Sequence, residues 1–211
     1  MLAANAALGL AAPTALGQSQ FQRLESPTSV SSRAVELARD DNRGGTARTV
    51  ATIAAANRRE AARPSFPVRG AFNWGQAAAA FGGPRGGRAH EGQDVMSRTG
   101  TPVVAVRSGE VLETGNDGGR GNYLDLYDPR TKATYVYMHM NRPPTVGAGD
   151  RVRSGQRIGE VGCTGSCFGD HLHFEIRAGR GIAGAARDPR PLLERWAVAD
   201  HIPATLAAGA N

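Results

Sequence analysis

The sequence has no long apolar run after its first residues. Beyond residue 17, no stretch approaches the roughly 18 consecutive apolar residues of a membrane-spanning helix, so we expect no stable membrane insertion once the N-terminal segment is removed. Aromatic residues are also few, at 6% of the chain. Basic residues before residue 64 alternate with acids and are not interleaved with aromatics, so the segment lacks the stacking platform typical of single-stranded nucleic-acid binding. We therefore expect no nucleic-acid partner.

Cysteine is scarce as well, with only Cys163 and Cys167. In an exported protein, two cysteines this close favour a local disulfide that closes a small loop. The alternative is a closed structural zinc site formed with His171 and His173. That Cys-x3-Cys-x3-His-x-His spacing is much tighter than the spacing of a zinc finger, and it leaves the other histidines unexplained.

The N-terminal part of the chain differs in composition from the rest. Residues 1–17 read "MLAANAALGLAAPTALG", an uncharged Ala/Leu-rich run that resembles the apolar region of a secretory signal, so we expect a secreted protein. Residues 18–64 are polar and form a predicted linker, with short helical patches at 35–39 and 49–62. The net charge of +6 favours anionic partners, and nucleic acid, anionic lipid surfaces and the bacterial cell wall all qualify, so charge alone does not choose between them.

Residues 65–195 are predicted to form one β domain. Short β-prone runs, among them "TPVVAVRSGEVLET", "NYLDLYD", "ATYVYMHM" and "HLHFEIR", alternate with glycine-rich turns at roughly even spacing. This pattern is typical of an all-β sandwich or barrel. One short helix is expected at about 192–197, and residues 196–211 are predicted to be a C-terminal tail.

Two of the predicted strands carry histidines. Because side chains alternate between the faces of a strand, "HLHFEIR" places His171, His173 and Glu175 opposite three apolar residues, Leu172, Phe174 and Ile176. In "YVYMHM", alternation groups His139 with two tyrosines, Tyr135 and Tyr137. The aliphatic residues Val136, Met138 and Met140 then lie on the other side, which we expect to face the core. If the two strands are neighbours, three histidines converge on one patch.

A further histidine, His90, precedes Asp94 by four residues in "HEGQD". A fully extended step of that length covers roughly 13 Å, too far for two ligands of one ion, so we expect the chain to bend at Gly92. Imidazoles together with one carboxylate suit zinc, which in catalytic sites takes three protein ligands and leaves one position open for water. The histidines and Asp94 therefore indicate a hydrolytic zinc site.

With these motifs assembled, the stretch from Phe66 to Leu193 resembles the lysostaphin-type, LytM-like family of peptidoglycan zinc endopeptidases. The family's three signatures appear in order, as "HEGQD", "YMH" and "HLHFEIR". The connectors "GTPVVAVRSGEV" and "GDRVRSGQRIGEVGCTG" are similar too. The resemblance implies an antiparallel β core of the duplicated hybrid motif type, with an open groove across it.

The resemblance also implies roles for the site residues. One zinc ion per chain would be bound by His90, Asp94 and His173, while His139 and His171 would be unligated and catalytic. The zinc activates a water for attack on a peptide carbonyl, and one of the two unligated histidines takes the proton. Asp170 stands where the family usually has proline, and we expect this added carboxylate to raise the pKa of His171.

Two other functions compete with an exported, monomeric endopeptidase that cuts the stem peptides or cross-bridges of peptidoglycan. A non-catalytic wall-binding or amidase-activating protein could share the fold, but such relatives have typically lost metal or catalytic histidines, and here all five positions are filled. A zinc nuclease or phosphoesterase would use the basic charge, but it lacks a stacking platform. The sequence therefore favours the peptidase and leaves the cleaved bond open.

Overall fold

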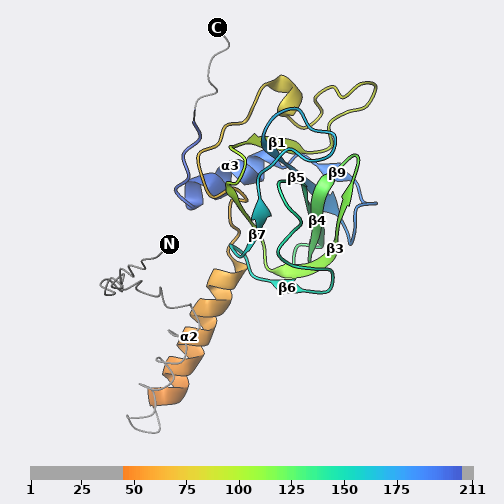
Figure 1. Cartoon of the computed structure of the whole chain (residues 1–211). Coiled ribbons are helices and arrows are strands. Elements are labelled where there is room, and N and C mark those ends of the chain that lie inside the picture. The colour runs from red at the N-terminus through yellow and green to blue at the C-terminus, as the bar shows by residue number, and fades with distance from the viewer. Residues whose placement is uncertain (1–44, 206–211) are drawn as a thin grey trace, which may run out of the picture. The chain divides into compact units, whose positions relative to one another are not determined.

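The computed structural model describes residues 45–205 (Figure 1). The chain divides into two units, Met1–Thr52 and Ile53–Asn211, and all described strands belong to the second unit. The expected helical patch at 49–62 lies within helix α2 (Gly45–Ala62). The apolar segment 1–17 and the patch at 35–39 lie outside the described residues. Among the helices within 45–205, none combines the length and apolar character needed to cross a bilayer.

The second unit is built mainly from antiparallel strands. Its elements in chain order are η1 (Ala77–Ala79), β1 (Gln93–Met96), β2 (Pro102–Val104), β3 (Gly109–Asp117), β4 (Gly121–Asp128), β5 (Ala133–Met140), β6 (Arg151–Val152), β7 (Arg157–Glu160), β8 (His171–Ala178), β9 (Ala186–Arg187) and α3 (Arg190–Ala199).

The main sheet has the strand order β1-β8-β5-β4-β3-β6, with β9 paired to β8, and a separate two-stranded sheet joins β2 to β7. Every pair of named strands is antiparallel. The order ends at β1 and β6, which do not pair with each other, so the main sheet is not a closed barrel. The prediction of an antiparallel all-β core is confirmed, and the two histidine strands, β5 and β8, are neighbours.

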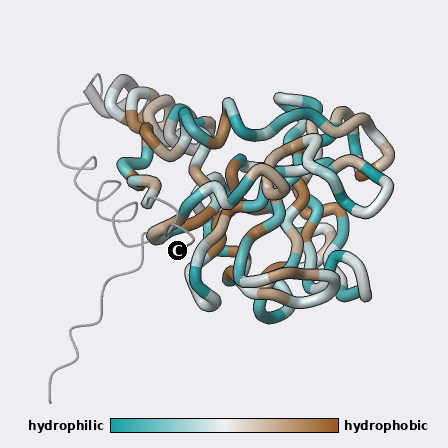
Figure 2. The backbone as a smooth tube through the Cα atoms, turned by 90° about the horizontal axis from the view of Figure 1, so that it is seen from above, coloured by the Kyte–Doolittle hydropathy of each residue, from teal (hydrophilic) through white to brown (hydrophobic). Residues whose placement is uncertain are grey.

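One face of the main sheet carries the hydrophobic core. Leu172 and Phe174 of β8 are fully buried and Ile176 is nearly so, as alternation along this strand predicts. Phe174 packs against Tyr137 of β5, with the ring centroids 5.3 Å apart. Each fully buried side chain of this size contributes about 1.5–3 kcal/mol to stability. Figure 2 shows the hydrophobic stretches running along strands inside the domain, with hydrophilic stretches in the surrounding loops.

The predicted core side of β5 is wrong. Tyr135 and Tyr137, not Val136 and Met138, belong to the buried core cluster, and only Met140 of the predicted core side belongs to it as well. A β-bulge then changes the sides on which His139 and Met140 lie: two steps along β4, from Leu124 to Asn122, oppose three steps along β5, from Tyr137 to Met140. An extra residue shifts the alternation by one position. The bulge contains His139, which has a φ of 64° and leaves the core side on which Tyr137 packs.

Helix α3 extends beyond the range predicted for it. Its residues Leu193, Trp196 and Ala197 are buried in the core. Further along the chain, the backbone N–H of Thr205 donates to the carbonyl of Phe72 over 2.7 Å. Part of the segment expected to be a C-terminal tail therefore packs against the domain.

Candidate metal centre

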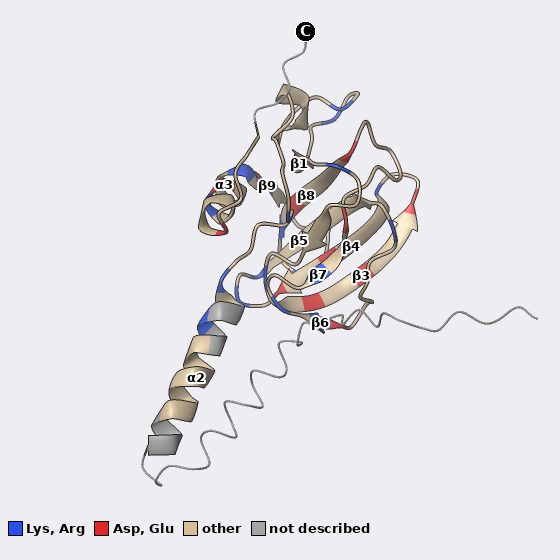
Figure 3. Cartoon of the chain, turned by 60° about the vertical axis from the view of Figure 1, so that its left-hand side comes forward, with Lys and Arg blue, Asp and Glu red and all other residues tan. Residues whose placement is uncertain are grey.

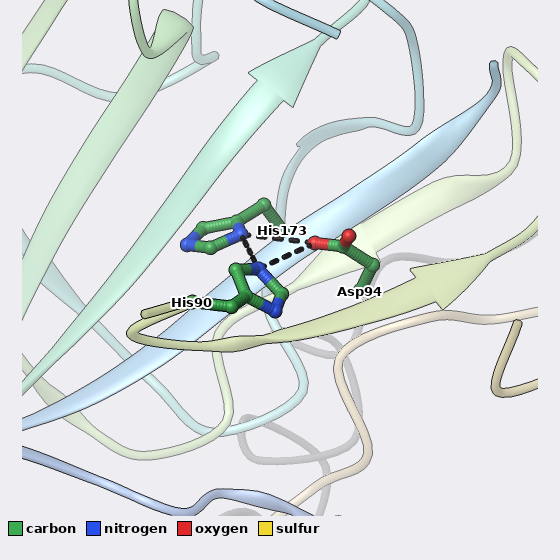
Figure 4. A group of neighbouring side chains, drawn as sticks. All are labelled: His90, Asp94 and His173. Carbon is green, nitrogen blue, oxygen red and sulfur yellow. Dashed lines mark hydrogen bonds and ion pairs between the residues drawn. The ribbon is translucent and has the colours of Figure 1, made fainter. Parts of the chain in front are cut away.

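Three of the predicted site residues meet at the edge of the main sheet. Antiparallel pairing of β1 and β8 places Asp94 directly opposite His173, and His90 comes from the loop that leads into β1 (Figure 4). His173 Nδ1 lies 2.9 Å from both Asp94 Oδ1 and His90 Nε2. His90 Nε2 lies 3.1 Å from the same carboxylate oxygen. One atom from each side chain thus converges on a single point, and all three residues are buried.

Gly92 permits this convergence by its lack of a side chain. A Cβ at this position would lie 2.6 Å from the carbonyl oxygen of Phe174 and 2.8 Å from His173 Nε2. Real Cβ atoms essentially never come so close, and one of these contacts is with backbone that cannot swing away. The sequence singled out Gly92 as a bend, and the structure adds a second requirement, the close approach of the chain to β8.

The hydrogen bonds on the outer side of each ring fix which nitrogen faces the centre. His90 Nδ1 lies 2.9 Å from the carbonyl oxygen of Ala80, which can only accept, so Nδ1 carries the proton. His173 Nε2 likewise donates to Glu175 Oε1 over 3.0 Å. The inward atoms, His90 Nε2 and His173 Nδ1, are left with lone pairs facing the Asp94 carboxylate. Three such atoms at this short range call for positive charge between them, and either a proton shared with Asp94 or a bound metal ion supplies it.

A zinc ion fits this set of donors. Two nitrogens and one carboxylate oxygen are ordinary zinc ligands, and a tetrahedral ion with ligand distances of about 2.0–2.1 Å separates its ligands by roughly 3.3 Å. The observed separations of 2.9–3.1 Å are close to that value. The outer partners of both histidines, a carbonyl and a carboxylate, are those that orient metal-bound imidazoles in proteins.

Arg85 and Glu175 support the metal centre from outside. The Arg85 guanidinium pairs with Asp94 Oδ2, the oxygen that does not face the two histidines, and also lies 3.1 Å from His90 Nε2. Burial opposes ionisation of Asp94, but the hydrogen bonds from His173 and His90 outweigh it and hold the pKa of this carboxyl well below its ordinary value. Glu175 is bound on its far side by Arg177, whose Nε lies 2.5 Å from Oε2.

The remaining two histidines lie beside this centre without joining it. The rings of His139 and His171 are 4.9 Å apart, and the ring of His139 is 5.9 Å from that of His173. His171 Nε2 lies 3.5 Å from Asp94 Oδ1, so its free nitrogen faces the same space. The Nδ1 atoms donate to backbone carbonyls over 2.8 Å, that of His139 to Thr164 and that of His171 to Gly169. Both Nε2 atoms are therefore lone-pair acceptors.

Burial sets the charge of these two rings. It lowers the pKa of His139 to about 4 and also lowers the pKa of His171, although Asp94 pulls the latter in the opposite direction. The expected effect of Asp170 on the pKa of His171 is not found, because the influences that raise this pKa come from Asp94 and the Gly169 carbonyl, and burial makes the net shift downward. The Asp170 side chain instead accepts a hydrogen bond from the backbone N–H of Thr99 at 3.1 Å. Both histidines are neutral near pH 7.

Sequence reasoning missed several parts of the site. Arg85 lies in a glycine-rich loop with no motif to mark it, and the carbonyls of Thr164 and Gly169 have no side-chain signal. Glu175 could have been found, since alternation places it on the face of His173, two residues along the strand. The structure joins Cys163 and Cys167 as a disulfide, with Cα atoms 5.4 Å apart, in the loop that supplies the carbonyl of Thr164.

Comparison with known proteins gives consistent relatives. The model of peptidase family M23 matches residues 88–189, which include all five site residues. Over 109 residues, or 51% of this chain and 22% of the relative, the sequence is 37% identical to lysostaphin of Staphylococcus simulans. It is 36% identical over 105 residues to the peptidoglycan DD-endopeptidase ShyC of Vibrio cholerae, covering 49% of this chain and 22% of that one. The match thus spans about a fifth of these curated relatives.

Solved structures agree with the sequence matches. The catalytic domain of lysostaphin from Staphylococcus simulans superposes with a TM-score of 0.51 at 36% identity, and the match covers 55% of this chain and 89% of that one. A zinc-containing peptidase from Vibrio cholerae superposes with a TM-score of 0.50 at 29% identity, covering 60% and 39% of the two chains. On these matches and the order of its motifs, the chain belongs to peptidase family M23.

Proposed function

We propose that this protein is an exported zinc endopeptidase that hydrolyses peptide bonds in bacterial peptidoglycan. The observation that carries the proposal is the convergence of one atom each from His90, Asp94 and His173, next to two neutral histidines outside that set. A wall-binding protein without activity has no use for the second pair. Their presence supports an enzyme over the non-catalytic alternative.

The residues divide the chemistry between them. Bound zinc supplies a Lewis acid that polarises a carbonyl and lowers the pKa of water. His90, Asp94 and His173 would hold it, with Glu175 and Arg85 fixing the ligand orientations. Because Nδ1 of His139 and of His171 already donates to a carbonyl, each Nε2 accepts a proton before it can give one. One of the two rings takes the proton of the attacking water and returns it to the leaving amine.

The substrate class rests on the relatives and on charge. Lysostaphin and ShyC are 37% and 36% identical to this chain over 109 and 105 residues, and ShyC is described as a peptidoglycan DD-endopeptidase. The net charge of +6 suits an anionic wall. Figure 3 shows basic and acidic residues interspersed over the strands and loops of the domain, so this attraction is a general one. Export is supported by the apolar segment 1–17 and by the disulfide, which persists in oxidising compartments.

The test is digestion of purified walls. The zinc-loaded protein is incubated with walls of different cross-bridge chemistry, and the soluble fragments are identified by mass. We expect cleavage at a peptide bond of the stem or the cross-bridge, loss of cleavage after chelation, and recovery when one equivalent of zinc is returned. Cleavage that persists in metal-free protein would contradict the zinc mechanism, and the absence of peptide cleavage in every wall would contradict the function.

A further inference from the structure

We propose that the disulfide-closed loop Cys163–Cys167 positions the two unligated histidines, and that it does so through two separable arms. The disulfide holds the acceptor of His171, and the side chain of Thr164 holds the acceptor of His139. The effect on turnover rests on the proposed function. The effect on the rings themselves does not, because it is visible without substrate.

Both histidines take their orientation from this loop and the residues just after it. His139 Nδ1 donates to the carbonyl of Thr164, inside the loop, and His171 Nδ1 donates to the carbonyl of Gly169, two residues beyond Cys167. Each bond is 2.8 Å long. If either carbonyl moves, its histidine loses the contact that keeps the proton on Nδ1 and the lone pair on Nε2.

The arm that serves His139 is fastened by non-covalent contacts. Thr164 Oγ1 donates to the carbonyl of Met140 over 2.8 Å and accepts from the backbone N–H of Asn122 over 2.9 Å, so the residue is tied to both β5 and β4. Beside it, Gly121 and Gly165 touch so closely that a Cβ on either would lie 2.3 Å from the other segment's backbone. These contacts hold the Thr164 carbonyl whether the disulfide is closed or open.

The arm that serves His171 has a different anchor. Between Cys167 and Gly169 lies Phe168, whose side chain is 89% exposed. Gly169 has a φ of 88° and open space where a Cβ would be. The carbonyl oxygen of Gly169 lies 3.0 Å from Cys167 Sγ, and that sulfur lies 3.8 Å from His171 Nδ1. Cys167 therefore anchors the segment before Gly169, while Asp170, which accepts from the backbone N–H groups of Ser97 and Thr99, anchors the segment after it.

The disulfide connects Cys167 to Cys163, which lies next to the main sheet. Cys163 follows Gly162, whose carbonyl accepts the backbone N–H of His171 over 3.2 Å, and Val161 before it is fully buried. The disulfide thus connects the segment at Gly169 to a part of the chain that already pairs with the start of β8. Opening it frees the segment that precedes Gly169, so the acceptor of His171 is held from one side only, while the backbone of His171 stays in place.

The experiment compares two variants of the zinc-loaded protein labelled with ¹⁵N at histidine. Cys163→Ser/Cys167→Ser opens the covalent arm, and Thr164→Val removes both hydrogen bonds of the other arm at nearly constant volume. The ring ¹⁵N shifts report which nitrogen carries the proton. In the cysteine variant we expect the signals of His171 to average between the two tautomers while those of His139 stay as in the parent. In Thr164→Val we expect the reverse.

Zinc content and wall cleavage complete the test. Both variants should retain one zinc per chain, and kcat should fall about 10-fold with KM unchanged, since a small misplacement of a reacting group costs up to about 100-fold. If the cysteine variant does not fold, the folded parent is reduced with a water-soluble phosphine. The phosphine becomes its oxide with oxygen from water, and the disulfide gains two electrons and two protons.

Two results would overturn the inference. Unchanged His171 signals in the opened or reduced protein would show that the disulfide does not position this ring, and equal disturbance of both histidines by both variants would show that the arms are not separable. A parent protein that cleaves no wall, but whose histidine signals respond as expected, would contradict only the proposed function.

Discussion

The two sides of the site are built by different means. On the ligand side, Asp94 and His173 face each other because two regular antiparallel strands pair in register. On the unligated side, His139 sits in a β-bulge with a φ of 64°, and both it and His171 are oriented by carbonyls of one loop. Two of the three proposed metal ligands are thus held by the sheet, and the groups proposed for proton transfer are held by irregular backbone, where strain commonly collects at functional sites.

The pKa of histidine is also shifted in opposite directions on the two sides. Burial lowers the pKa of His171, whereas at His173, two residues along the strand, burial is outweighed by hydrogen bonds to Asp94 and Glu175 that raise the pKa. Neighbours whose environments separate their pKa values are typical of sites that assign different roles to similar groups. The carboxylates on the ligand side favour a cation, and the unligated side favours neutral rings.

The largest effect is expected from breaking the ligand side itself. Replacing Asp94 with alanine removes the oxygen that faces His90 and His173 and leaves Arg85 without its carboxylate. We expect zinc affinity to fall by more than the roughly 100-fold that loss of an outer partner costs, with no measurable cleavage. Competition with a zinc indicator measures the affinity. Asp150→Ala, in an exposed turn, is the control and should bind zinc as the parent does.

Breaking the unligated side should separate chemistry from metal binding. His139→Ala removes a ring that donates to the Thr164 carbonyl but touches no ligand atom of the metal centre. We expect the protein to keep one zinc and to lose about 100-fold or more in turnover, the range for a general acid or base. Metal analysis and wall cleavage on the same sample measure zinc binding and turnover separately. Loss of zinc from this variant would place His139 among the ligands.

A milder change tests the support of the ligand side. Glu175→Gln keeps the shape of the side chain but replaces the carboxylate that accepts from His173 Nε2. We expect zinc affinity to fall about 10- to 100-fold, while turnover at saturating zinc stays within a few-fold of the parent. Glu110→Gln, which alters an ion pair with Arg180 away from the site, is the matched control and should change neither value. An unchanged affinity in Glu175→Gln would show that the pairing is incidental.

The smallest effect on the site is expected from Asp125. It pairs in register with Val136, which pairs with Glu175, so it shares the face of the site. Its Oδ1 has no hydrogen-bond partner within the described part of the chain. Burial raises its pKa from 3.8 to about 6. Between these values the folded state binds more protons than the unfolded one, so stability falls as pH rises through this window.

Asp125→Asn should remove this loss of folding stability at high pH. We expect the variant to melt a few degrees higher than the parent at pH 8 and to show no such gain near pH 4, where the parent carboxyl is protonated in the folded state. Zinc affinity and turnover should be unchanged. A variant that is destabilised at pH 8, or that loses zinc, would show that the ionised carboxylate contributes to the fold or to the site.

The sequence predicted the parts of this molecule that depend on regular strands. The antiparallel core, the buried face of Leu172, Phe174 and Ile176, and the shared face of His171 and His173 all follow from alternation and spacing. The sequence assigned the core side of β5 to the aliphatic residues instead of the tyrosines. Strict alternation also could not reveal the bulge that moves His139 off the core side. It missed Arg85 and the two loop carbonyls because backbone acceptors and long side chains on glycine-rich loops carry no periodic signal.

The most direct test of the division between ligand and unligated histidine uses two positions on one strand. His171→Ala and His173→Ala remove rings from the same face of β8, two residues apart, so their effects on packing are matched. Zinc per chain and wall cleavage are measured on both. We expect His173→Ala to lose zinc and cleavage together, and His171→Ala to keep one zinc per chain while cleavage is lost. Loss of zinc from His171→Ala, or its retention by His173→Ala, would contradict the account.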